Sequence, residues 1–152
     1  MKTIDTNAYV SVLQDLIAEG REVSLLISGS SMEPFLKHQR DYICFRAPDR
    51  ELAAGDMVFY RRENGQYIMH RIYRVAEEGY YLVGDNQVEI EGPLDRSQIF
   101  ALITKVKRNG HWLTPEDRSW KFFARLWPRT IPVRAFAGRV QRKLRRMVKG
   151  QD

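Results

Sequence analysis

The chain has 152 residues, of which 43% are hydrophobic and 11% aromatic, so it holds enough apolar material for one packed domain and is not a wholly disordered chain. Its single cysteine, Cys44, excludes an intrachain disulfide and any multi-cysteine metal site, and the apolar run around it predicts a buried thiol. The formal net charge of +6 is unevenly distributed, because residues 1–117 contain 14 Lys or Arg and 18 Asp or Glu, whereas residues 118–150 contain 11 Lys or Arg and no acid. The charge pattern therefore predicts an acidic body, residues 1–117, and a strongly basic tail, residues 118–152.

The first predicted element is a helix over residues 6–19, where Val10, Leu13 and Ile17 recur at helical spacing and Gly20 can end it. Apolar runs separated by turn residues then predict a series of short strands. They lie at residues 23–27, 42–45, 57–60, 67–75, 80–83, 99–106 and 111–113. Asn64-Gly65 predicts a tight hairpin turn between the third and fourth of these strands. Many short strands with one helix predict a mainly β fold, either a compact barrel or rolled sheets.

The basic tail differs in kind from the body. Its first part, Trp120 to Trp127, is aromatic and basic, and Pro128 and Pro132 interrupt the chain after it. Apolar residues then follow at spacings of three and four, with basic residues on the remaining faces, which predicts an amphipathic helix with a cationic polar face. Three interpretations are open for this tail: attachment to an anionic membrane, non-specific binding of nucleic acid, or packing against the acidic body.

We favour membrane attachment through residues 118–149, because aromatic side chains suited to a membrane interface precede the cations. The residues expected at the membrane are Trp120, Trp127, Arg142, Lys143, Arg145 and Arg146. No specific nucleic-acid partner is expected. The sequence has no early apolar stretch typical of a signal peptide and no run of about 18 apolar residues, so neither a signal peptide nor a transmembrane helix is predicted. These features predict a location in the cytoplasm or on the cytoplasmic face of a membrane.

Three short segments carry the residue types that serine peptidases use. Ser28-Gly29-Ser30-Ser31-Met32-Glu33-Pro34 offers a hydroxyl, Met69-His70-Arg71 offers a histidine, and Gly84-Asp85-Asn86 places an acid in a tight turn. A serine hydroxyl needs a neighbouring base to accept its proton, and that base needs a group that orients it. A histidine with its ordinary pKa of about 6.5 suits this task at neutral pH.

Together with Gly55-Asp56-Met57, these segments resemble the type I signal peptidases, whose superfamily also includes the self-cleaving repressor peptidases. The resemblance covers residues 23–108 and implies the compact β core of those enzymes. It further implies Ser31 as the nucleophile and His70 as the general base. Asp85 is implied as the acid of the last segment, which either orients His70 or positions the nearby backbone and Arg71. Most bacterial members use a lysine as the base; the His-Arg pair found here is similar to that of the endoplasmic-reticulum and archaeal branch.

The resemblance leaves two details of the site open. Glu89, Glu91 or Asp95, which follow the Gly-Asp-Asn turn, could supply a second acid, and the sequence does not choose among them. Some relatives carry a serine two positions before the nucleophile, where its hydroxyl helps to form the oxyanion hole, but Gly29 stands there in this chain. Backbone N–H groups near Ser31, with Ser30, are therefore expected to bind the oxyanion.

The sequence thus predicts a serine endopeptidase of the signal-peptidase type that cleaves a leader or signal segment from a precursor peptide or protein. No cofactor is expected, and three scattered histidines without ligand spacing predict no metal site. One alternative is a catalytically inactive β-rich module that binds a membrane or another protein. A further alternative is a self-cleaving peptidase of the repressor type; its usual Ala-Gly cleavage site is present as Ala137-Gly138, but within the predicted tail helix.

Overall fold

Eight strands and three α-helices follow one another along residues 6–150, the part of the chain that this computed structural model describes. The strands are β1 (Val23–Leu26), β2 (Tyr42–Arg46), β3 (Met57–Arg61), β4 (Tyr67–Ala76), β5 (Gly79–Val83), β6 (Glu91–Leu94), β7 (Ile99–Arg108) and β8 (His111–Leu113). The helices are α1 (Thr6–Ala18), α2 (Arg118–Arg125) and α3 (Ile131–Lys149), with two 3-10 helices, η1 (Arg96–Gln98) and η2 (Trp127–Thr130). The ends of the predicted body and tail, residues 1–5 and 151–152, lie outside the described residues.

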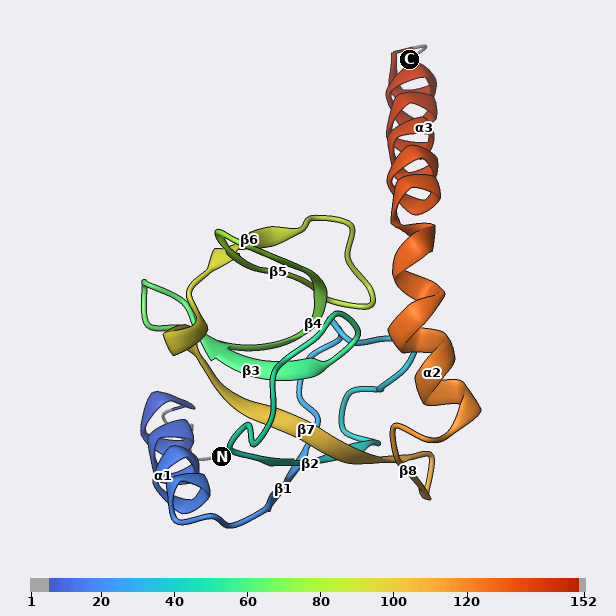
Figure 1. Ribbon diagram of the computed structural model, residues 1–152. Coiled ribbons are helices and arrows are strands. Elements are labelled where there is room, and N and C mark those ends of the chain that lie inside the picture. The colour runs from blue at the N-terminus through green and yellow to red at the C-terminus, as the bar shows by residue number, and fades with distance from the viewer. Residues whose placement is uncertain (1–5, 151–152) are drawn as a thin grey trace.

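The strands form one antiparallel sheet with the order β1-β2-β7-β3-β4-β5-β6, and β8 pairs with β7. Register shifts interrupt the β2–β7, β3–β7 and β4–β5 ladders, and such bulges bend and twist the strands that carry them. Figure 1 shows β3 to β6 curling over, while β1, β2 and β7 cross below them. The mainly β prediction is confirmed, and of its two forms the structure is a rolled sheet that does not close into a barrel.

Every strand that the sequence predicted is present, whereas β6 was missed. Its sequence, Glu91-Gly92-Pro93-Leu94, contains the two residues that normally argue against a strand. The strand forms because it lies at the end of the sheet order, where it pairs with β5 alone, so the missing N–H of Pro93 costs no central ladder bond. This omission matters because β6 brings Glu91 to the functional site.

Two clusters of buried apolar side chains fill the rolled sheet. The larger cluster lies under the turn that follows β1 and includes Met32, Phe35 and Leu36 of that turn, each of them at most 2% exposed. The smaller cluster lies within the curl of β3 to β5 and includes Val58, Tyr60, Ile72 and Leu82. Burial of each such large apolar side chain contributes about 1.5–3 kcal/mol, so the turn after β1 is held by its own core residues.

Helix α2 covers the larger cluster with aromatic side chains. Trp120 and Phe123 are three positions apart, so they share one helix face, and both pack on Phe35, with ring centroids 5.9 and 4.9 Å away. Trp127, just after α2, donates its Nε1–H to the carbonyl oxygen of Asp85 over 2.7 Å. Trp120 and Trp127 thus attach the tail to the body, and their contact with a membrane stays a prediction. An aromatic-rich amphipathic segment looks the same in sequence whether it faces lipid or a protein core.

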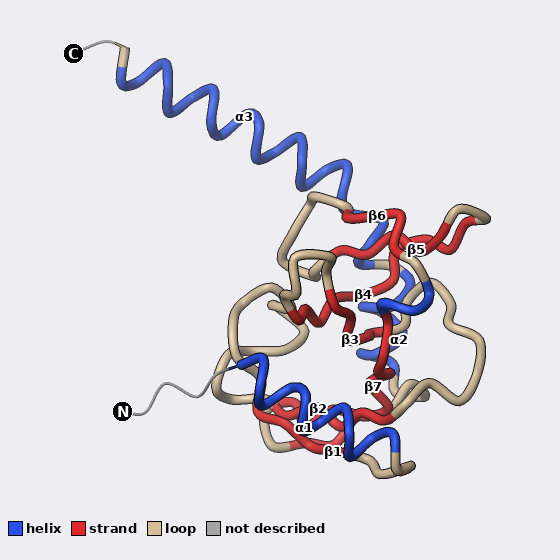
Figure 2. The backbone as a smooth tube through the Cα atoms, turned by 90° about the vertical axis from the view of Figure 1, so that its left-hand side faces the viewer, coloured by secondary structure: helices blue, strands red, loops and turns tan. Residues whose placement is uncertain are grey.

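Helix α3 is the predicted amphipathic helix, and it projects away from the body (Figures 1 and 2). Pro132 lies in its first turn, where a proline costs no helical hydrogen bond. Among residues 6–150, none of the helices is both long and apolar enough to cross a membrane. The division of the chain into residues 1–117 and 118–152 stays a prediction, and α2 belongs to the packed body by its contacts.

Candidate active site

Ser31 lies in the turn that follows β1, and buried side chains hold this turn in place. The side chain of its neighbour Met32 is buried in the larger cluster. The buried carboxylate of Asp41 accepts hydrogen bonds from the backbone N–H groups of Lys37 and Asn109, at 2.8 and 2.9 Å. Asp41 therefore ties the end of the Ser31 turn to the β7–β8 connection, and Ser31 itself remains half-buried beside the cavity described below.

The Gly84-Asp85-Asn86 turn holds the backbone of Ser31 from the other side. The Asn86 N–H donates to the carbonyl oxygen of Ser31 over 2.9 Å. A Cβ atom on Gly84 would lie 2.6 Å from that same oxygen, which is closer than van der Waals contact allows. Glycine is therefore required at this position because the two turns approach each other so closely.

Asp85 pairs with Arg71. Two oxygens of its carboxylate accept hydrogen bonds from Nε and Nη2 of Arg71, each at 2.8 Å, and both side chains are almost completely buried. Arg71 also donates to the carbonyl oxygen of Gly55 over 2.9 Å, and its guanidinium lies 5.5 Å from the ring centroid of Phe35. The pair thus connects the β4 strand, the turn before β3 and the Ser31 turn. Of the two roles expected for Asp85, this ion pair supports the positioning of Arg71 and the nearby backbone, and a direct role on His70 stays a prediction.

His70 lies on β4, in register with Val58 on β3, and is 4% exposed. Its Nδ1 is 3.2 Å from the hydroxyl oxygen of Tyr60, and that hydroxyl donates its proton to the carboxylate of Glu91. A tyrosine hydroxyl has only one proton, so the Tyr60 oxygen must act as the acceptor toward His70. His70 therefore carries its proton on Nδ1, which leaves the Nε2 lone pair free to accept a proton.

Glu91 is held in place by Arg62, whose Nε donates to its carboxylate over 2.7 Å. The chain His70–Tyr60–Glu91–Arg62 thus joins strands β3, β4 and β6 to the short segment after β3. Of the acids left open by the sequence, Glu91 is the one that reaches the base, through Tyr60. Glu89 is exposed, and Asp95 caps η1 by accepting the N–H of Ser97 over 2.9 Å.

Burial sets the protonation of this hydrogen-bonded chain. It lowers the pKa of His70 to about 4; the negative charge of Glu91 opposes this effect and the positive charge of Arg62 adds to it. This value differs from the ordinary histidine pKa assumed from the sequence, because His70 lies within β4 rather than at the strand's end and its side chain is buried. Burial and the hydrogen bond to Glu91 also raise the pKa of the Tyr60 hydroxyl. Both groups are therefore neutral at pH 7.

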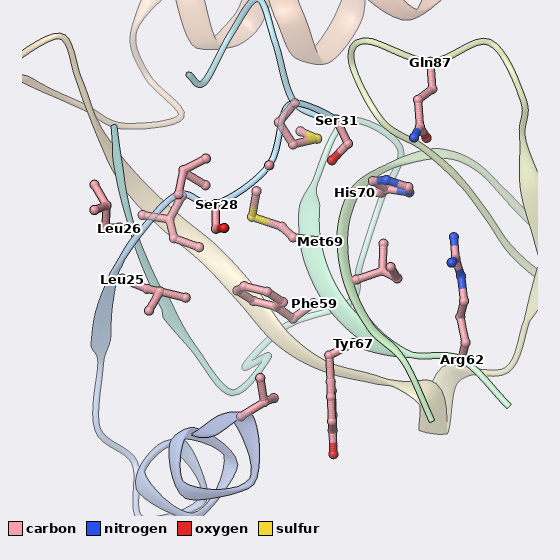
Figure 3. Close-up of a pocket in the computed structure, with 16 residues that line it drawn as sticks. Leu25, Leu26, Ser28, Ser31, Phe59, Arg62, Tyr67, Met69, His70 and Gln87 are labelled. Atoms are coloured by element: carbon pink, nitrogen blue, oxygen red, sulfur yellow. The ribbon is translucent and has the colours of Figure 1, made fainter. Parts of the chain in front are cut away.

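Ser31 and His70 line one cavity of about 620 Å³. Its walls are mostly apolar and come from α1, β1, β2, β3 and β4, as illustrated by Val10, Leu25, Ile43, Phe59 and Met69. Figure 3 shows the Ser31 hydroxyl pointing toward the side of the cavity where His70 lies, with Gln87 above them and Phe59 and Tyr67 below. Among the described residues that line this cavity, the basic side chains are Arg62 and His70.

The remaining residues near Ser31 differ in whether they line the cavity. Ser30 is exposed, whereas Ser28 and Gly29 line the cavity with Ser31. His38 is exposed and accepts the N–H of Gly29 through Nδ1 over 2.7 Å. Tyr60, Arg62 and Ser28 were not predicted as site residues from the sequence. The signal for Tyr60 was present, because the Asn64-Gly65 hairpin sets a register in which Tyr60 is a diagonal neighbour of His70 on the same face.

A mainly β fold with a serine on a core-anchored turn and a neutral, buried histidine on the same cavity fits the superfamily of signal peptidases and self-cleaving repressor peptidases. A family model described as Peptidase S24-like matches residues 2–107, which is more than half of the chain, and the chain belongs to this family. Membership supports a function of the serine-peptidase type without distinguishing signal peptidase from self-cleaving repressor. Comparison with curated proteins and with solved structures gave no match.

Proposed function

We propose that the chain is a serine endopeptidase that removes a leader or signal segment from a precursor peptide or protein with a Ser31–His70 pair. The observation that carries the proposal is the identity of the basic groups at the cavity. An arginine cannot lose its proton in a protein, so of Arg62 and His70 only His70 can accept the proton of Ser31. The lysine base used by most bacterial relatives has no counterpart among the described residues that line the cavity.

In the proposed reaction, the Ser31 hydroxyl oxygen attacks the carbonyl carbon of the scissile peptide while Nε2 of His70 accepts its proton. His70 then gives that proton to the leaving amine, and the peptide C–N bond breaks to leave an acyl group on Ser31. A water molecule, deprotonated by His70, hydrolyses the acyl ester and regenerates the serine. In this proposal, backbone N–H groups near Ser31 bind the oxyanion, other than that of Gly29, which already donates to His38. Ser28, unlike Ser30, lines the cavity.

Tyr60 and Glu91 are proposed as positioning residues for the base. Tyr60 accepts the Nδ1–H of His70, and Glu91 accepts the Tyr60 proton, so the ring is held in the tautomer that the reaction needs. When His70 becomes positive in the transition state, the negative charge of Glu91 stabilises it through the hydroxyl of Tyr60. In this proposal Asp85 acts on Arg71 and on the architecture of the site rather than on His70.

The test is cleavage of leader peptides with small residues at the cut, read by mass spectrometry. Wild type is compared with Ser31→Ala and His70→Asn, and with two controls on exposed residues of the same types, Ser24→Ala and His111→Asn. The expected result is cleavage by wild type and both controls, with loss of at least about a hundredfold in Ser31→Ala and His70→Asn. Cleavage that survives Ser31→Ala would overturn the mechanism, and no cleavage by wild type across a peptide library would favour the inactive binding module.

A further inference from the structure

Helix α3 exposes an entire apolar stripe. Ile131, at the start of the helix, is buried, but the six large apolar side chains that follow are between 40% and 71% exposed; they are Val133, Phe136, Val140, Leu144, Met147 and Val148. At about 100° of rotation per residue, these six positions fall within an arc about 120° wide. A stripe of this width normally faces a protein core. Here the helix points away from the body and the stripe lies open (Figures 1 and 2).

The rest of the α3 surface is cationic. Seven basic residues occupy the arc beside and opposite the apolar stripe: Arg134, Arg139, Arg142, Lys143, Arg145, Arg146 and Lys149. No Asp or Glu occurs between residues 118 and 150 to neutralise them. The helix therefore combines a continuous apolar face with a continuous positive face.

We propose that α3 is a docking helix for an anionic lipid surface, with the apolar stripe buried between the acyl chains and the cations against the headgroups. Lipid satisfies both faces at once, because Lys and Arg extend toward phosphates while the stripe leaves water. Apart from Arg134, which is bonded to the body, pairing with a second copy of α3 would bring two sets of six exposed like charges together. A nucleic acid would neutralise the cations but leave the apolar stripe in water.

The first turn of α3 is hydrogen-bonded to the turn of residues 85–87, which borders the cavity. Arg134 donates from Nη1 to the carbonyl oxygens of Asp85 and Gln87, at 3.2 and 3.1 Å, and its guanidinium lies 4.7 Å from the ring centroid of Trp127. Gln87 lines the cavity, and its neighbour Asn86 bonds the backbone of Ser31. Hydrogen bonds thus link α3, through the turn of residues 85–87, to the backbone of Ser31 at the cavity.

This connection indicates which substrates the site receives. A helix docked on lipid holds the 85–87 turn, and with it the cavity, near the membrane surface. The precursor class is then a peptide or protein that is itself bound to an anionic membrane, a statement that rests on the proposed peptidase function. Docking itself does not depend on catalysis, so the two can be tested separately.

The docking test uses the inactive Ser31→Ala chain and sedimentation with vesicles of phosphatidylcholine alone or mixed with phosphatidylglycerol. Binding to the mixed vesicles is expected, and it should weaken steeply with salt. Arg142→Gln with Arg146→Gln should weaken it about 25-fold, at about fivefold per cation. Val140→Ser with Leu144→Ser should also weaken it, whereas exposed residues outside the tail, Arg21→Gln and Val75→Ser, serve as controls without effect.

Absence of binding to mixed vesicles at low salt would overturn the proposal. So would sedimentation equilibrium showing a dimer that Val140→Ser with Leu144→Ser abolishes, because the stripe would then bind a second copy. For the substrate class, the active chain is given one leader peptide in acylated, vesicle-bound form and in free form. The arginine variant is expected to lose the rate advantage on the bound form alone, and equal rates on both forms by wild type would overturn the substrate class while leaving docking intact.

Discussion

Arg71 and Asp85 form a buried bidentate ion pair with both hydrogen bonds at 2.8 Å. Arg71 directly follows the proposed base, His70, in the sequence, but its side chain points away from it. Arg71 and His70 are consecutive residues of β4, so their side chains point to opposite faces of the strand. One face thus carries the base and its partners Tyr60 and Glu91, and the other carries the charge pair that holds the turns together. This separation predicts different consequences for the two acids.

Asp85→Asn should destabilise the fold, because it leaves the charge of Arg71 buried without its partner. Removal of one partner from a buried pair typically costs about 3–5 kcal/mol. Urea unfolding of the variant should therefore show a large drop in the midpoint at an unchanged slope. Asp49→Asn, which breaks the exposed pair with Arg46, is the matched control and should cost less than about 1 kcal/mol. Wild-type stability in Asp85→Asn, together with lost activity, would show that Asp85 acts on the base instead.

Stability should fall as the pH is lowered from about 6.5 toward 4, because His70 is buried in its neutral form. In this window the unfolded chain binds a proton at His70 that the folded chain, with a pKa of about 4, does not bind. The full effect approaches about 3 kcal/mol below pH 4. His70→Asn keeps a side-chain N–H near the Nδ1 position but cannot titrate, so its free energy of unfolding should change less over this range. Parallel curves for the two proteins would contradict the burial of His70.

Tyr60→Phe and Glu91→Gln should lower kcat about ten- to a hundredfold with little change in KM, since each removes one hydrogen bond that supports the base. Glu91→Gln has a second, diagnostic effect. The Glu91 charge raises the pKa of His70, so its loss should move the acid limb of the kcat profile to lower pH. Glu89→Gln, at an exposed acid nearby, is the control.

Nitrogen NMR of the His70 ring tests the positioning role of Tyr60 and Glu91 without an activity measurement. Wild type should show the Nδ1–H tautomer, and Tyr60→Phe should show a mixture, because the acceptor that selects the tautomer is gone. Reduced activity with an unchanged tautomer and an unchanged pH profile would mean that Tyr60 and Glu91 only stabilise the fold.

The sequence was sufficient for seven of the eight strands, because apolar runs and turn residues such as Asn64-Gly65 determine local structure directly. The sequence could not select Glu91 as the acid near His70, because β6, a strand with Gly and Pro, forms only when it pairs with a neighbouring strand. The lowered pKa of His70 also could not be predicted from the sequence, since that value depends on how far the sheet curls over β4. The packing of the tail's tryptophans on the body was not predicted, because lipid and a protein core select the same amphipathic pattern.

Gly84→Ala should impair catalysis more than it impairs folding. Its new Cβ would lie 2.6 Å from the Ser31 carbonyl oxygen, so one of the two turns must move. Overpacking of this kind costs about 1–3 kcal/mol, and displacement of a nucleophile by about 1 Å can cost about a hundredfold in rate. Gly138→Ala is the matched control, because no atom lies within 4 Å of its new Cβ and it sits inside α3. That variant should gain up to about 1 kcal/mol in helix stability without a change in rate. Normal kinetics in Gly84→Ala would show that the contact does not position Ser31.

The chain should not cleave itself at Ala137-Gly138. A peptidase of this kind binds its substrate as an extended strand, whereas this bond lies inside α3, where the backbone hydrogen bonds of the helix are already formed. Self-cleavage would require several turns to unwind, and the anchoring of Arg134 on the 85–87 turn opposes movement of that segment into the cavity. Wild type incubated alone at neutral and alkaline pH should therefore retain its intact mass over the time in which it cleaves a leader peptide. Fragments ending at Ala137, formed at a rate independent of protein concentration and absent from Ser31→Ala, would instead assign the chain to the self-cleaving type.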